Sequence, residues 1–173
     1  MSEALEALYA GEVEKAHELL PPDEQLSVFE AAAFGRLDAL RWSLDADPAQ
    51  ATALSDDGFT ALHLAVFGGQ EEAVRLLLER GADPKALSTN EAVRVPPLST
   101  AAFVRSVPLA RLLLDSGADV NGRGEGGFTA LHSAAQNGDG DLARLLLERG
   151  ADKSLATDDG RLPADYGLRD FLS

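Results

Sequence analysis

Apolar residues recur at helical spacing in three leucine-rich segments of the chain. Within each segment these positions lie three or four residues apart or adjacent, which places them on one face of a helix. They are Ala73, Val74, Leu76 and Leu77, then Leu109, Leu112 and Leu113, then Leu142, Leu145 and Leu146. A glycine follows each segment, at Gly81, Gly117 and Gly150. Because a left-handed residue is favoured just past a helix end, the pattern predicts three helices that each stop at a glycine.

The same segments belong to a longer repeat. The stretch from Gly58 reads GFTALHLAVFGGQEEAVRLLLERGAD, and it returns 69 residues later, from Gly127, as GFTALHSAAQNGDGDLARLLLERGAD. A third copy begins at Pro96 and reads PPLSTAAFVRSVPLARLLLDSGADVN, so the interval divides into units of 36 and 33 residues. A looser copy, without the hairpin motif, begins at Phe29 and reads FEAAAFGRLDALRWSLDADPA. A period of this length predicts stacked small units that share a core.

These motifs resemble the ankyrin repeat. Its unit has a Gly-x-Thr-Pro-Leu-His turn, a first helix that ends near a glycine, a leucine-rich second helix and a closing Gly-Ala-Asp. The resemblance covers roughly residues 24 to 165, and the chain departs from it at Ala61 and Ala130, where the family has proline. It implies an all-α fold, an ankyrin-repeat solenoid of stacked helix-turn-helix units with β-hairpin-like loops, capped at both ends.

The repeat boundaries predict one domain over residues 1–173. We expect repeats at 23–54, 55–87, 88–123 and 124–156, of which the third is divergent and carries an insertion. Residues 3–20 predict two short helices separated by Gly11, so that 1–22 form a degenerate N-terminal cap. Residues 157–173 keep Gly160 and a helix start at Pro163 but stop after about one helix, which indicates a truncated C-terminal cap.

Two threonine and histidine pairs are predicted to hold the turns. Thr60 and Thr129 stand as helix N-caps, where a hydroxyl accepts from backbone N–H groups. His63 and His132 then fall at the third helical position, where an imidazole can share hydrogen bonds with the threonine, as Glu or Gln does in a capping box. This assigns both histidines to the scaffold.

The charge and composition narrow the function classes. The chain carries 29 acidic and 15 basic side chains, for a net charge of -14, and residues 1–54 contribute -8 of it. Such a surface repels a phosphate backbone, so we expect no nucleic-acid partner. If the partner is charged, we expect it to present a basic surface. There is no cysteine, which excludes disulfides and thiolate chemistry. No secretory signal or membrane-spanning run is present, so we expect a cytoplasmic monomer with no membrane partner.

No set of residues predicts catalysis. His63 and His132 lie two repeats apart and cannot share a metal ion or a substrate, and His17 is isolated on an acidic helix. Neither a glycine-rich phosphate loop, nor a Gly-x-Ser-x-Gly elbow, nor a metal-ligand pair at helical spacing is found. We therefore expect no enzyme activity, no cofactor and no metal site. Trp42, which aligns with Leu76 of the next repeat, is expected to pack in the core.

Candidate binding residues lie where repeats are free to vary. In the ankyrin family, partners are met by the hairpin tips and the inner face of the first helices. Carried onto this sequence, that surface consists of Phe34, Asp56, Asp57, Phe59, Phe67, Phe103, Glu125 and Phe128. Several phenylalanines on one exposed strip favour a binding role. Packing within the hairpin is an equally good explanation for an aromatic that directly precedes the threonine.

The third repeat departs from the pattern. Ser99 stands at the histidine position, Arg105 at the helix-end glycine and Arg94 at the hairpin glycine, and three extra residues lie within 86–96. Insertions in such arrays project to one face and often serve binding, which makes Arg94 and Arg105 further candidates. Sequence drift, compensated by the Pro96-Pro97 helix start, explains the same features equally well.

The sequence thus predicts a non-catalytic protein-protein interaction module, an adaptor or regulator. The alternative is an acidic inhibitor or immunity-type protein that covers a basic enzyme or a nucleic-acid-binding site.

Overall fold

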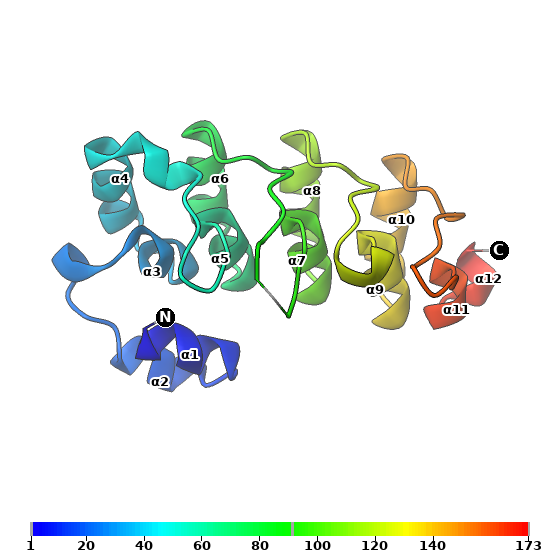
Figure 1. The fold of residues 1–173 in the computed structure, drawn as a ribbon, viewed down its shortest axis with the longest axis horizontal. Coiled ribbons are helices and arrows are strands. Elements are labelled where there is room, and N and C mark those ends of the chain that lie inside the picture. The colour runs from blue at the N-terminus through cyan, green and yellow to red at the C-terminus, as the bar shows by residue number, and fades with distance from the viewer. Residues whose placement is uncertain (1, 91, 173) are drawn as a thin grey trace. The chain divides into compact units, whose positions relative to one another are not determined.

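A computed structural model describes residues 2–90 and 92–172, and its regular secondary structure is helical (Figure 1). Within this part of the chain, the strand-like pairing is an isolated antiparallel bridge between Leu54 and Thr60. The all-α prediction is therefore confirmed. The α-helices are α1 (Glu3–Tyr9), α2 (Val13–Glu18), α3 (Val28–Ala33), α4 (Leu37–Ala46), α5 (Ala61–Phe67), α6 (Glu71–Glu79), α7 (Pro97–Phe103), α8 (Val107–Asp115), α9 (Ala130–Gln136), α10 (Gly140–Glu148), α11 (Pro163–Tyr166) and α12 (Arg169–Leu172).

The contacts divide the chain into two compact units. Unit 1 holds the described residues up to 83 together with 88–90, and unit 2 holds 84–87 and the described residues from 92 onward.

In unit 1 the repeats form two stacked helix pairs. The first helices α3 and α5 pack against each other, and the second helices α4 and α6 do the same. The side chains between them are almost fully buried leucines, alanines and valines, among them Leu40, Leu62, Val74 and Leu77. The first helices approach closely, since a Cβ built on Gly68 would lie 1.9 Å from the carbonyl oxygen of Ala33. Neighbouring repeats therefore share one core, which is how such arrays gain their stability.

The two N-terminal helices lie outside this stack. α1 and α2 pack mainly against each other, and Figure 1 shows them below α3 and α5, not as a further pair in their row. Buried residues of α1 and α2 form one apolar cluster with Phe34, Leu64 and other residues of the first helices. We call α1 and α2 the N-terminal helical pair. The two short helices predicted around Gly11 are present, and they contact the side of the first helices.

The prediction that Trp42 packs in the core is wrong. Its side chain is 65% exposed, whereas Leu76, at the same position of the next repeat, is 7% exposed. α4 is the first of the second helices and packs on α3 and α6, whereas α2 packs on α1. Because α2 does not stack ahead of α4, this apolar position has no preceding helix to cover it.

Unit 2 repeats the same arrangement. α7 packs against α9, α8 against α10, and α9 against α11. Leu98, Leu113, Leu131, Leu142 and Leu146 are almost fully buried between them. Where the sequence predicts about one helix near the C-terminus, the structure has two short ones, α11 and α12, joined at Gly167 and Leu168.

The turn between first and second helix requires a left-handed residue in each repeat. Gly35, Gly69 and Gly138 have φ of 65°, 73° and 66°, and Arg105 takes the same conformation with φ of 58°. Arginine is strained there because its Cβ crowds the following carbonyl, which glycine avoids. The third repeat thus keeps the turn geometry after losing the glycine.

Candidate protein-binding surface

The threonine and histidine pairs form the turns that the sequence predicts. In unit 1, Thr60 is the N-cap of α5, and its hydroxyl lies 2.8 Å from Nδ1 of His63. In unit 2, Thr129 and His132 repeat this contact at 2.9 Å. Both histidines are almost fully buried, at 1% and 0% exposure. A group so enclosed stabilises the turn and does not reach a partner.

His132 makes a second contact, within unit 2. Its Nε2 lies 3.3 Å from the carbonyl oxygen of Arg161, which ties the turn before α9 to the turn before α11. Burial lowers the pKa of His132 below its usual value, because the charged imidazolium loses its water; the Arg161 carbonyl opposes this effect and the Arg123 charge adds to it. The folded protein therefore favours the neutral imidazole.

We define the first-helix face of unit 1 as the surface formed by α3, α5 and the hairpin turn 55–59. At its rim lies Asp57, whose carboxylate accepts hydrogen bonds from the hydroxyls of Ser55, at 2.5 Å, and of Tyr9, at 3.0 Å. Tyr9 is the last residue of α1, so this bond joins the N-terminal helical pair to the hairpin. Burial, with Asp57 adding to it, raises the pKa of Tyr9 far above its usual value.

Aromatic rings fill the space beneath the N-terminal helical pair. The ring of Tyr9 lies edge-on to Phe67 with 5.2 Å between centroids and is tilted on Phe59 at 6.3 Å. The ring of His17, on α2, lies edge-on to Phe34 at 5.2 Å. Both geometries are favourable for aromatic pairs. The pair therefore covers three of the phenylalanines that the sequence places on the candidate binding surface.

This packing corrects the expected exposure of those residues. Phe34 is 6% exposed, so the prediction that it points outward is wrong. Phe59 and Phe67 are half-buried, and Asp57 is occupied by two hydroxyl donors. Asp56, next to them, is exposed as expected. Their part in partner binding stays a prediction.

In unit 2, Phe128 is covered in a similar way. Its ring lies 5.0 Å from Tyr166 on α11 and 5.3 Å from His132. Glu125, three residues earlier, is exposed. The sequence leaves two explanations open for Phe128 and Phe59, partner binding and packing within the hairpin. The contacts of both rings agree with packing around the hairpin.

Phe103 contrasts with the other phenylalanines. It is the last residue of α7, the position that Phe67 holds in α5, yet it is 69% exposed. An aromatic ring left in water forgoes the free energy of burial, about 1.5–3 kcal/mol for a phenylalanine. Single exposed apolar side chains are common on protein surfaces, so it is the place of Phe103, at the end of a first helix, that keeps it among the candidate binding residues.

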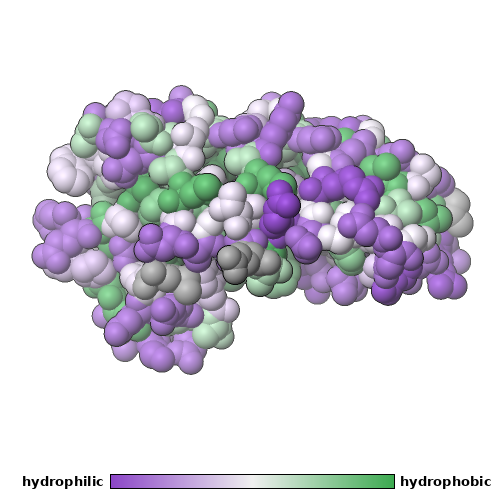
Figure 2. Space-filling model, in the orientation of Figure 1, coloured by the Kyte–Doolittle hydropathy of each residue, from purple (hydrophilic) through white to green (hydrophobic). Residues whose placement is uncertain are grey.

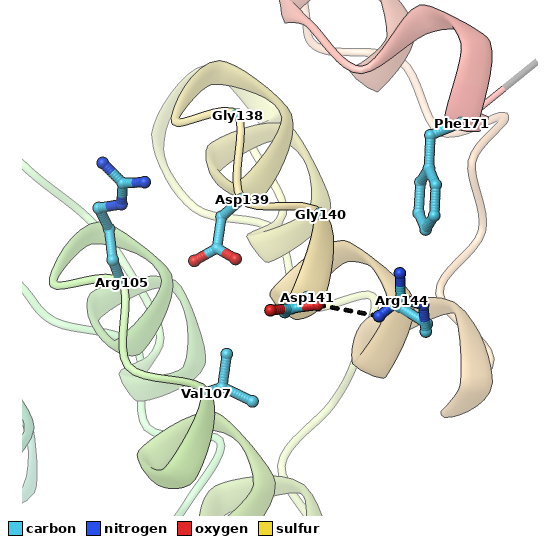
Figure 3. Close-up of a pocket in the computed structure, with 8 residues that line it drawn as sticks. All are labelled: Arg105, Val107, Gly138, Asp139, Gly140, Asp141, Arg144 and Phe171. Atoms are coloured by element: carbon cyan, nitrogen blue, oxygen red, sulfur yellow. Dashed lines mark hydrogen bonds and ion pairs between the residues drawn. The ribbon is translucent and has the colours of Figure 1, made fainter.

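The two arginines of the third repeat lie in different places. Arg94 is exposed, and its carbonyl oxygen accepts a hydrogen bond from the N–H of Glu125 at 2.6 Å, so the inserted segment pairs with the next hairpin. Arg105 lines an open hollow between the helix turns of unit 2 (Figure 3). Asp139, Asp141, Arg144 and Phe171 line it as well, and Asp141 pairs with Arg144 at 2.9 Å. Both charge signs are present, so the hollow is not selective for an anion or a cation.

The described residues hold no group of three or more His, Asp or Glu side chains that could bind a metal ion. Within the same residues, no helix has the length and apolar character needed to cross a membrane.

Sequence reasoning missed the two tyrosines, Tyr9 and Tyr166. A signal for the first was present, since the apolar residues of this short helix are Ala4, Leu5, Ala7, Leu8 and Tyr9 and its other residues, Glu3 and Glu6, are acidic. A helix of this composition must pack against something.

Comparison with known proteins identifies the repeats. A family profile described as ankyrin repeats (many copies) matches residues 28–90, and another described as ankyrin repeats (3 copies) matches residues 85–157. Together they cover residues 28–157 and do not include the N-terminal helical pair.

Several curated proteins are similar over these repeats. The B-cell lymphoma 3 protein homolog of Mus musculus is 46% identical over 99 residues, which is 57% of this chain and 22% of that protein. Ankyrin repeat and SOCS box protein 3 of Bos taurus is 36% identical over 141 residues, 80% of this chain and 26% of the relative. Protein phosphatase 1 regulatory subunit 27 of Mus musculus is 42% identical over 74 residues, 43% of this chain and 48% of the relative. The chain thus spans less than half the length of each of these relatives.

Proposed function

The chain belongs to the ankyrin-repeat family, and from that premise we propose that it is a non-catalytic adaptor or regulator that binds another protein through its first helices and hairpin turns. The ankyrin repeat is generally a protein-interaction fold without catalytic activity. One mouse relative is named protein phosphatase 1 regulatory subunit 27. These two facts support a binding role and leave the partner open.

The observation that carries the proposal is the exposure of Phe103. A ring that is 69% exposed at the end of a first helix contributes little to the folded core. Buried aromatic anchors dominate the energetics of protein interfaces, and an exposed one on a binding face is suited to that role. Arg105, two residues later, adds a charged group that can pair with a partner carboxylate.

The net charge of -14 is the main support for our proposal on the chemistry of the partner. It favours a partner with a basic surface and disfavours nucleic acid, because like charges repel at long range. We further propose a cytoplasmic monomer that needs no cofactor and does not bind membranes.

Affinity purification with two matched variants tests the proposal. Phe103→Ser removes the exposed ring of a first helix, and Trp42→Ser removes an equally exposed ring, 65%, from a second helix. Proteins captured by the wild type and quantified by mass spectrometry should fall at least tenfold with Phe103→Ser and persist with Trp42→Ser. The reverse pattern, or no difference between the variants, would place the interaction elsewhere.

A second candidate function is that of an acidic inhibitor that covers a basic site. The observation that favours it is the outer side of the N-terminal helical pair, which is largely hydrophilic in Figure 2 and exposes five glutamates: Glu3, Glu6, Glu12, Glu14 and Glu18. A charge-driven partner would lose affinity steeply as ionic strength rises. Capture that is unchanged between 50 and 500 mM salt, on the order of a threefold change in Debye length, would rule this candidate out.

A further inference from the structure

The N-terminal helical pair occupies the kind of surface that the proposed function assigns to a partner. Ala4, Leu5 and Ala7 of α1 and Ala16 of α2 are buried in one cluster with Ala33, Phe34 and Leu64 of the first helices. Leu8, Tyr9 and Phe59 pack at its edge. The first-helix face of unit 1 therefore already holds a helical ligand, supplied by the chain itself.

The contacts at the rim show which chemistry this face accepts. The Tyr9 ring packs on Phe59 and Phe67 while its hydroxyl donates to the carboxylate of Asp57 at 3.0 Å. Glu30 of α3 is already engaged in its own helix, because its carboxylate accepts hydrogen bonds from the N–H and the hydroxyl of Ser27 in a capping box. The face thus combines an apolar floor with one carboxylate, that of Asp57, which accepts a hydrogen bond from the pair.

The next repeat shows the same position with a higher exposure. Phe67 and Phe103 both end a first helix, but Phe67 is half-buried against Tyr9 and Phe103 is 69% exposed. A largely exposed aromatic is therefore tolerated at this position of the repeat. Covering Phe67 is not a requirement of the helix pair to which it belongs.

The helices of the pair are short. α1 has 7 residues and α2 has 6, lengths at which isolated helices are unstable in water, so each depends on packing. α1 contacts α2 far more than it contacts α3. The connection to α3 runs through Pro21 and Pro22 and the 3₁₀ helix Asp23–Gln25, which form no further helix pair. A segment held in this way can detach while the repeats stay folded.

We propose that the first-helix face of unit 1 binds amphipathic helices and that the N-terminal helical pair is its resident, displaceable occupant. The inference rests on the proposed function in one respect, that first-helix faces bind proteins. The partner segment is a helix that presents leucine-sized side chains to Phe34 and Leu64. At the position of Tyr9 it carries an aromatic hydroxyl or a cation that donates to Asp57. In the free protein the pair already occupies the face, so the partner segment binds the face with a lower apparent affinity.

The test uses the chain's own segment as the probe. A synthetic peptide of residues 2–20 with a fluorescent label is titrated with the full-length protein, and binding is read as fluorescence anisotropy. The proteins compared are the wild type and the double variant Leu5→Ala with Tyr9→Ala, which weakens the resident pair. We expect the double variant to bind the peptide at least about tenfold more tightly, because the tethered copy no longer competes.

Two further substitutions locate the binding. Phe67→Ser in the double variant should abolish peptide binding, and Phe103→Ser in the same background should leave it unchanged. Equal affinity for the wild type and the double variant would show that the pair does not compete with the peptide, and absence of binding to both would show that the face does not bind this helix. Either result overturns this inference. Neither result bears on the proposed function, which the affinity purification with Phe103→Ser and Trp42→Ser tests separately.

Circular dichroism checks that the double variant keeps its helical content. If it does not, Tyr9→Phe decides the question, since it removes only the hydroxyl that contacts Asp57. An affinity about fivefold above that of the wild type then supports the inference, and an unchanged affinity overturns it.

Discussion

Replacing Tyr9 by phenylalanine isolates one contact of the N-terminal helical pair. The ring keeps its packing on Phe59 and Phe67, and only the 3.0 Å hydrogen bond to Asp57 is lost. Tyr166→Phe is the matched control. Its ring also packs on a hairpin phenylalanine, Phe128, but within the described residues its hydroxyl makes no hydrogen bond.

The size of the effect follows from the nature of the bond. A hydrogen bond to a charged group contributes about 1.5–3 kcal/mol, and Ser55 still bonds the carboxylate after the change. The site is half-buried, so we expect about 1–2 kcal/mol, which is a factor of roughly 5–30 in the opening equilibrium of the pair. Tyr166→Phe should change stability by less than about 0.5 kcal/mol.

Amide hydrogen exchange measures this equilibrium directly. Amides of α1 and α2 should exchange about 5–30 times faster in Tyr9→Phe than in the wild type, while amides of α9 remain unchanged. If α1 and α9 accelerate together, the pair opens only by global unfolding. That result, or no acceleration at all, refutes the reasoning that this bond holds a separately opening segment.

The same bond gives a pH dependence at the alkaline end. Burial and Asp57 raise the pKa of Tyr9, so the folded state holds the phenol proton more tightly than the unfolded state. The stabilisation is therefore complete below the unfolded value of about 10 and is lost as the pH rises beyond it. In the Tyr166→Phe variant, absorbance at 295 nm reports Tyr9 alone, and ionisation near pH 10 would contradict the prediction.

Three further predictions concern the scaffold. Arg105→Gly should stabilise the protein by about 0.5–1 kcal/mol in urea unfolding, because glycine removes the strain of φ 58°; a loss of stability would contradict this. Gly68→Ala should cost more than about 2 kcal/mol, since the new Cβ would meet the Ala33 carbonyl oxygen, whereas Gly69→Ala, in open space, should cost about 1 kcal/mol. His132→Gln keeps a capping residue without the charge, and because the pKa of His132 is lowered, its stabilisation is present above about pH 6.5 and lost below. The wild type should then lose more stability than the variant between pH 7 and pH 5, and parallel curves would argue against it.

The sequence predicted the features that depend on local chemistry. The helices of the repeats, the threonine caps and the turn position of Arg105 all follow from residues that lie within a few positions of each other or recur with the period. The repeat alignment also indicated that Arg105 replaces a glycine, and the structure shows that it keeps the left-handed conformation.

The features that the sequence could not predict depend on which neighbour covers a side chain. Trp42 occupies a core position of the repeat, but it is exposed because the N-terminal helical pair does not stack ahead of α4. The pair packs instead on the side of the first helices, and there it covers Phe34 and Phe67. The pair lies outside the repeat period, so alignment with other repeats contains no information about where it packs.

The central claim is that a partner protein contacts the first helices. A photoreactive benzoylphenylalanine incorporated in place of Phe103 tests it most directly, with the same group in place of Trp42 as the control, since both side chains are exposed. On irradiation in native lysate, the protein labelled at position 103 should form a discrete adduct that the protein labelled at position 42 does not form. An adduct from position 42 and none from position 103 would contradict the account.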